Sequence, residues 1–166
     1  QNAELGLSVQ YPTTWQKADT ASGVQFLIPI DDTQVSTVNR LEVDINVTSG
    51  KCSFPPVTTV DSRGTIDVGT SKLNTISISN TVQGRSYFNR MYSLEKSGIC
   101  YFFSFSYVAL SPDSKGLSGS NLTQAQNNNK AIKATADAAF TAMVKTLTFV
   151  TAPVGQEETT ASPIKK

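Results

Sequence analysis

The sequence of 166 residues contains no histidine, and this absence excludes several kinds of chemistry at once. Triad hydrolases use histidine as the proton-transfer group. Zincins and the iron oxygenases with a facial triad need it as a metal ligand. The sequence also lacks GxxxxGK[ST] and GxGxxG, the glycine-rich motifs that hold nucleotide phosphates. We therefore expect that the chain is not an enzyme and that it carries no cofactor.

Charge and long apolar runs are also scarce. Charged residues make up 16% of the chain, and its net charge is +1. Basic residues occur singly, apart from Lys165 and Lys166, whereas nucleic-acid-binding proteins cluster their cations against phosphates. No stretch approaches the run of about 20 apolar residues that spans a membrane. These features predict a chain that binds no nucleic acid and has no membrane span of its own.

The chain has two cysteines, Cys52 and Cys100, which without histidine cannot complete a four-ligand zinc site. Cys100 opens a strand-like run and Cys52 lies in a turn-rich segment between strands, so we expect a disulfide; two separate buried thiols are the alternative. Abundant Ser, Thr and Asn often accompany secreted or cell-surface proteins. We predict an extracytoplasmic location (secreted, periplasmic or cell surface). The start at Gln1 is compatible with removal of a signal or anchor.

Apolar residues alternate with polar ones along much of the chain, which is the period of half-buried strands. Such runs occur at residues 5–11, 24–30, 41–48, 65–68, 73–80, 85–95 and 99–110, with turns at 82–84 and 96–98. Pro29 cannot donate to a strand ladder, so its strand is expected to lie near an edge or to end there. The last run places Tyr101, Phe103, Phe105 and Tyr107 on one face. We expect this aromatic row to be the centre of the core.

The C-terminal part changes to helical spacing. Composition predicts a flexible loop at residues 111–122 and then a helix from Thr123, which forms a capping box with Gln126. Apolar residues then recur every three or four positions and would lie across the apolar face of the sheet; they are Ile132, Ala136, Ala139, Phe140, Met143, Val144 and Leu147. Residues 148–150 are expected to form a final short strand. We predict one domain at 1–150 and a disordered tail at 151–166.

Three short segments resemble the PsbP-like (Mog1/PsbP) family of exported domains. They are GLSVQYPTTW at residues 6–15, VQG at 82–84 and FTAMVKTLTF at 140–149. The resemblance implies an α+β fold, with an antiparallel sheet of about six strands and a long C-terminal helix on one face of an α/β/α sandwich. The chain shows no second long helix, and it has no histidine to match the metal sites of plant members. The family has diverse roles, so the resemblance implies little about function.

Carboxylates are the remaining candidates for chemistry. Asp31 and Asp32 share a predicted turn, and Glu42 and Asp44 lie on one face of a predicted strand. Oxygen ligands of this kind suit calcium, and the alternative is an ordinary Asp turn and a solvated strand face.

Three functions follow from these observations. The first is a non-catalytic extracytoplasmic binding or assembly module, which presents one sheet face and its loops to another envelope or secreted protein. The second is a carrier that holds a small apolar ligand between helix and sheet. The third is a carboxylate-based hydrolase or a calcium-binding domain.

Overall fold

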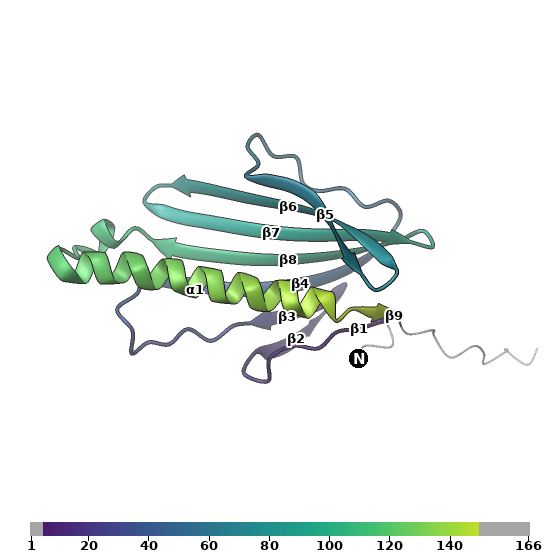
Figure 1. Cartoon of the computed structure of the whole chain (residues 1–166), viewed down its shortest axis with the longest axis horizontal. Coiled ribbons are helices and arrows are strands. Elements are labelled where there is room, and N and C mark those ends of the chain that lie inside the picture. Colours follow the sequence, from purple (N-terminus) through teal and green to yellow (C-terminus); the bar gives the residue numbers. More distant parts are fainter. Residues whose placement is uncertain (1–4, 150–166) are drawn as a thin grey trace, which may run out of the picture.

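The computed structural model describes residues 5–149 and shows a curved antiparallel sheet with one long helix along one face (Figure 1). The sheet has seven strands in the order β2-β3-β4-β8-β7-β6-β5, and every neighbouring pair is antiparallel. The strands are β2 (Gln16–Thr20), β3 (Gly23–Leu27), β4 (Val38–Ser49), β5 (Ser62–Val68), β6 (Ser71–Val82), β7 (Arg85–Lys96) and β8 (Ile99–Leu110). The helix is α1 (Gly119–Lys145). The predicted fold class is confirmed.

Tight turns join the three long strands β6, β7 and β8, which have 12 residues each. Gln83 and Gly84 have φ angles of 49° and 71°, and Ser97 and Gly98 have 53° and 72°. Two successive left-handed residues are typical of type I′ turns, whose twist matches that of the strands they connect. The predicted turns are confirmed, and the glycines supply the second left-handed position without a Cβ clash.

The main core lies between the sheet and α1. The aromatic row of β8 is buried as predicted, with Phe103 and Phe105 at 0% exposure. Phe140 of α1, also at 0%, lies 5.9 Å from the ring centre of Phe105 and 5.4 Å from that of Tyr92. Each buried ring removes on the order of 150–250 Å² from water. The aromatic row therefore fixes where the helix lies.

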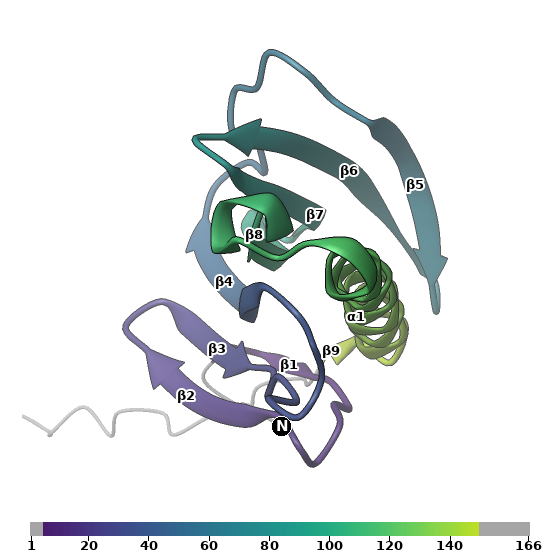
Figure 2. The same ribbon diagram turned by 90° about the vertical axis from the view of Figure 1, so that its left-hand side faces the viewer.

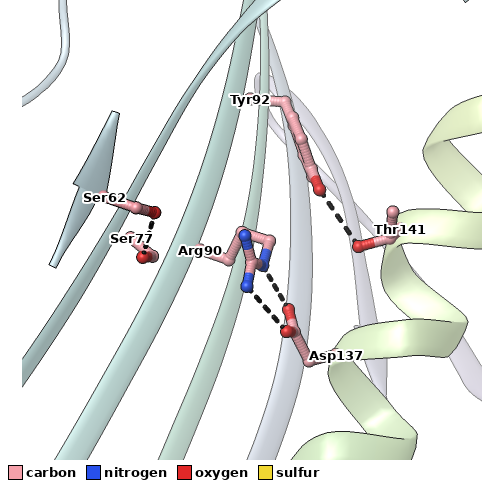
Figure 3. Close-up of polar contacts among 6 residues, drawn as sticks. All are labelled: Ser62, Ser77, Arg90, Tyr92, Asp137 and Thr141. Atoms are coloured by element: carbon pink, nitrogen blue, oxygen red, sulfur yellow. Dashed lines mark hydrogen bonds and ion pairs between the residues drawn. The ribbon is translucent and has the colours of Figure 1, made fainter. Parts of the chain in front are cut away.

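Polar contacts also fix the helix against β7 (Figure 3). Arg90 Nε donates to Asp137 Oδ1 at 2.6 Å, and Arg90 Nη2 donates to Oδ2 at 2.9 Å. One turn further along, the Tyr92 hydroxyl lies 3.0 Å from Thr141 Oγ1. The two-point Arg–Asp contact is directional, so it sets the rotation of the helix as well as its position.

The predicted disulfide is present on the opposite face of the sheet. Cys52 and Cys100 are joined with a Cα–Cα distance of 5.0 Å. Figure 2 shows the connection between β4 and β5, residues 50–61, passing around the face of the sheet away from α1. The bridge joins the start of this connection to the beginning of strand β8.

A second, smaller apolar cluster lies on that opposite face. Ile76 and Met91 are cross-strand partners that point away from α1, yet they are only 0% and 6% exposed. The ring of Phe54, from the 50–61 connection, lies 6.0 Å from the ring of Phe102 on β8. Because the connection covers this part of the sheet, Ile76 and Met91 can be buried on the face away from α1.

The N-terminal region differs from the prediction. Of residues 5–11, only β1 (Leu7–Ser8) forms a strand, and it pairs with β9 (Thr148–Phe149) in a separate two-stranded sheet. The predicted final strand is thus confirmed for its first two residues; residue 150 and the predicted tail at 151–166 lie outside the described residues. Strand β2 adds one member to the six expected. It was missed because all five of its residues are exposed and show no alternation.

The predicted start of the helix was wrong. The helix begins at Gly119 rather than Thr123, and its N-cap, Ser118, makes no side-chain capping bond. The predicted loop also contains the short 3₁₀ helix η1 (Pro112–Lys115). Ala125 is 0% exposed, so tertiary packing holds the first turns of α1 despite their poor helix formers. Among residues 5–149, no helix is both long and apolar enough to cross a membrane.

Candidate functional site

A groove of about 350 Å³ runs along α1 on the side where the connection from β3 to β4 passes. We call it the α1 groove. Its lining is mostly apolar and comes from the helix, from this connection and from the turn before β2. The principal side chains are Trp15, Ile28, Ile30, Leu41, Ile132 and Ala136. Trp15, Leu41 and Ala136 are buried and form the floor, whereas the three isoleucines are half-buried and remain available to an occupant.

The outer wall of the groove exists because β3 ends early. The strand stops at Leu27, before Pro29, as the missing amide hydrogen predicts. The chain then crosses to α1 before it starts β4. Asn128 Nδ2 donates to the carbonyl of Val35 at 2.9 Å, which ties this connection to the helix.

A buried asparagine makes a second set of hydrogen bonds between α1 and the connection from β3 to β4. Asn129 is 8% exposed, and its Oδ1 accepts from the backbone N–H of Thr37 at 2.9 Å. Its Nδ2 donates to Thr37 Oγ1 at 2.7 Å. By intrinsic propensity, the asparagine run at 127–129 only weakens a helix. Two of these residues in fact hold the wall of the groove, and a polar run inside a helical stretch was the only feature that could have indicated it.

Asp31 lies at the rim of the groove and is fully engaged within its own turn. Its Oδ1 accepts from Thr33 Oγ1 at 2.6 Å and from Thr33 N at 3.0 Å, and its Oδ2 accepts from Gln34 Nε2 at 3.1 Å. The bond from the Thr33 hydroxyl, followed by that from the Thr33 backbone, lowers the pKa of the Asp31 carboxyl below its ordinary value. The rim therefore carries a negative charge at neutral pH.

The other predicted carboxylates lie on the face of β4 that points away from α1. Glu42 is 5% exposed, and Arg40 Nε donates to its Oε2 at 2.7 Å. Glu42 thus faces outward on a part of the strand that polar contacts cover, because the Arg40 side chain bonds it. Asp44 accepts from Gln25 Nε2 at 3.1 Å. Desolvation raises the pKa of the Asp44 carboxyl, and the nearby Glu42 charge raises it further.

The structure does not gather the four predicted carboxylates into one site. Asp31 and Asp32 lie in the connection after β3, whereas Glu42 and Asp44 lie on β4 with Arg40 and Gln25 as their partners. In the part of the chain that the structure describes, no three His, Cys, Asp or Glu side chains lie close enough together to hold a metal ion. The calcium and hydrolase alternatives thus stay predictions.

Two solved structures are distant neighbours of this chain. No family model and no curated protein matches the sequence. A protein of Bacteroides thetaiotaomicron VPI-5482 is similar with a TM-score of 0.48 and 17% identity, over 88% of this chain and 46% of that one. The chain thus spans about half the length of that protein. LpqN of Mycobacterium tuberculosis, which is involved in cell envelope biogenesis, is similar with a TM-score of 0.48 and 10% identity, over 87% of this chain and 83% of LpqN. Neither comparison names the PsbP-like family, so that resemblance stays a prediction.

Proposed function

We propose that this chain is a non-catalytic binding module that acts outside the cytoplasm and holds a small apolar ligand in the α1 groove. The observation that carries the proposal is the groove itself, with its volume of about 350 Å³ and its apolar lining. Sites for small molecules are typically concave, mostly apolar and about 300–1,000 Å³ in volume. The hydrogen bonds of Asn128 and Asn129 hold the wall of the groove in place without a ligand. Binding therefore loses little free energy to the ordering of the wall.

The lining indicates which ligand fits. Burying the half-exposed sides of Ile28, Ile30 and Ile132 stabilises a complex by roughly 25 cal/mol for each Å² removed from water. The ionised Asp31 carboxylate at the rim repels a second negative charge. The proposed ligand is therefore an apolar molecule whose polar end is neutral or cationic, rather than a fatty-acid anion.

The disulfide supports a location outside the cytoplasm. Disulfides form and persist in oxidising compartments and are rare where thiols are kept reduced. The low charged fraction of the sequence, 16%, agrees with such a setting.

A protein partner on a sheet face, the first function predicted from the sequence, has weaker support. Segment 50–61 covers part of the face opposite α1. The rest of that face carries engaged polar pairs, including Asn89 with Ser106 at 2.9 Å and Gln25 with Asp44, together with scattered apolar side chains such as the exposed Leu27. Polar groups that already bond one another offer less to a partner than an open apolar groove.

Trp15 gives a direct test, because it is the one tryptophan of the chain and lies in the groove. The full chain is titrated with the neutral fluorescent probe N-phenyl-1-naphthylamine, and energy transfer from Trp15 reports its binding. Decanol is then expected to displace the probe more effectively than decanoate. Native mass spectrometry of the protein from an envelope extract would show the natural ligand as an added mass.

Two alanines of α1 supply matched variants. Ala131 lines the groove, and Ala134 is exposed and lies outside its lining. Ala131→Phe is expected to weaken probe binding about tenfold by filling the groove, since one lost contact worth 1.4 kcal/mol has that effect. The Ala134→Phe variant should bind the probe with the same affinity as the unaltered chain. The proposal would be overturned if energy transfer from Trp15 to the probe did not saturate, or if both variants bound the probe with equal affinity.

A further inference from the structure

A second hollow, of about 280 Å³, lies on the other flank of α1, and an unpartnered hydroxyl of a buried tyrosine opens into it. Tyr107 lines this hollow and is 6% exposed. Its hydroxyl makes no hydrogen bond to any residue within 5–149. Thr75 Oγ1 is the one enclosed side-chain oxygen or nitrogen without a partner in that range, so the Tyr107 hydroxyl reaches open space. Tyr92, in contrast, bonds Thr141.

Two lysine residues line the same hollow. Lys130 and Lys133 come from adjacent turns of α1, and neither forms an ion pair with a carboxylate of the described chain. Lys133 Nζ lies 4.8 Å from the ring centre of Phe88, a cation–π contact that orients it. The hydroxyl of Ser86 adds a further donor. The hollow therefore offers hydrogen-bond donors and positive charge, and its lining contains no carboxylate.

The remaining lining is either apolar or already satisfied. Ala109, Leu110 and Pro112 form an apolar side, and the amide of Asn129 is used by Thr37. Burial raises the pKa of Tyr107 to about 12, so its hydroxyl keeps its proton at physiological pH and acts as a donor.

We propose that this lysine–tyrosine pocket binds the carboxylate of a small organic anion. The Tyr107 hydroxyl and the two ammonium groups would donate charge-assisted hydrogen bonds to the carboxylate oxygens. The apolar side would cover part of the carbon body. The pocket shares no lining residue with the α1 groove, so this site does not depend on the proposed function.

Benzoate is the probe, because it joins a carboxylate to a compact apolar ring. The full chain is titrated at constant ionic strength, and backbone amide shifts are followed by NMR. Saturable shifts are expected at Gln126–Lys133 of α1 and at Leu110, with a Kd of about 1 mM, which corresponds to roughly −4 kcal/mol. Benzyl alcohol, which lacks the charge, and inorganic phosphate, which lacks the apolar body, should bind more weakly.

Matched variants distinguish binding of benzoate in this pocket from non-specific attraction of the anion to positive charge. Tyr107→Phe removes only the hydroxyl and is expected to weaken benzoate binding about tenfold, because a hydrogen bond to a charged group is lost. Tyr101→Phe, at a row position equally buried but outside the pocket, should leave the affinity unchanged. Lys130→Gln with Lys133→Gln should abolish binding, whereas Lys145→Gln should not. Absence of saturable shifts, equal affinity of Tyr107→Phe and Tyr101→Phe, or tighter binding of phosphate than of benzoate would overturn the proposal.

Discussion

Replacing both Cys52 and Cys100 by alanine should lower the free energy of unfolding by about 4 kcal/mol, by the relation between loop length and the entropy of the unfolded chain. The two residues are 48 positions apart, so the bridge closes a long loop in the unfolded chain. Reduction of the unaltered protein should cause a similar loss, because it opens the same loop.

The altered protein is expected to remain folded, because other contacts hold both ends of the 50–61 connection. Gly50 N donates to the carbonyl of Gly98 at 2.8 Å, and Asp61 N donates to that of Ser77 at 2.9 Å. The cluster under the connection, with Ile76 and Met91, should become more mobile but stay covered on average. The native strand ladders of β7 and β8 do not depend on the bridge.

Urea unfolding measures this loss. The buried Trp15 ring, 6% exposed, reports unfolding through its fluorescence. With a typical slope of about 2 kcal/mol per molar urea, the midpoint should fall by about 2 M. The melting temperature should fall by roughly 10 °C. A loss below about 1 kcal/mol would refute the reasoning that the bridge acts by restricting the unfolded chain.

Three further substitutions test the packing and the electrostatics. Phe140→Ala should cost about 3–5 kcal/mol in the same urea assay, because it leaves a cavity against the aromatic row; a cost near that of a surface residue would contradict the placement of α1. Asn129→Ala should cost about 1–3 kcal/mol by leaving the Thr37 N–H without an acceptor, and unchanged stability would contradict that tie. Asp44→Asn should raise the melting temperature at pH 7. The folded-state pKa of Asp44 is raised, so the unaltered protein loses stability as pH rises above about 4, and the advantage of Asn should vanish near that pH in calorimetry. An advantage that is the same at both pH values would contradict the assignment.

Local patterns in the sequence determined six of the seven strands of the main sheet and the composition of the main core. Alternation at 99–110 placed Tyr101 to Tyr107 on one face, and helical spacing placed Phe140 on the stripe that meets it. Such predictions succeed because the period of a strand or helix is set by the backbone within a few residues. The disulfide was also predictable, since two cysteines permit a single intramolecular pairing.

The tertiary structure alone decided the features on which the two proposed binding sites rest. The α1 groove brings residues 28–34 beside residues 131–139, about a hundred positions later in the chain, and no local pattern encodes that meeting. The unpartnered hydroxyl of Tyr107 depends in the same way on how distant segments pack around it. Periodicity tells which face a side chain occupies. What covers that face, and where the cover leaves a gap, depends on how distant segments pack together.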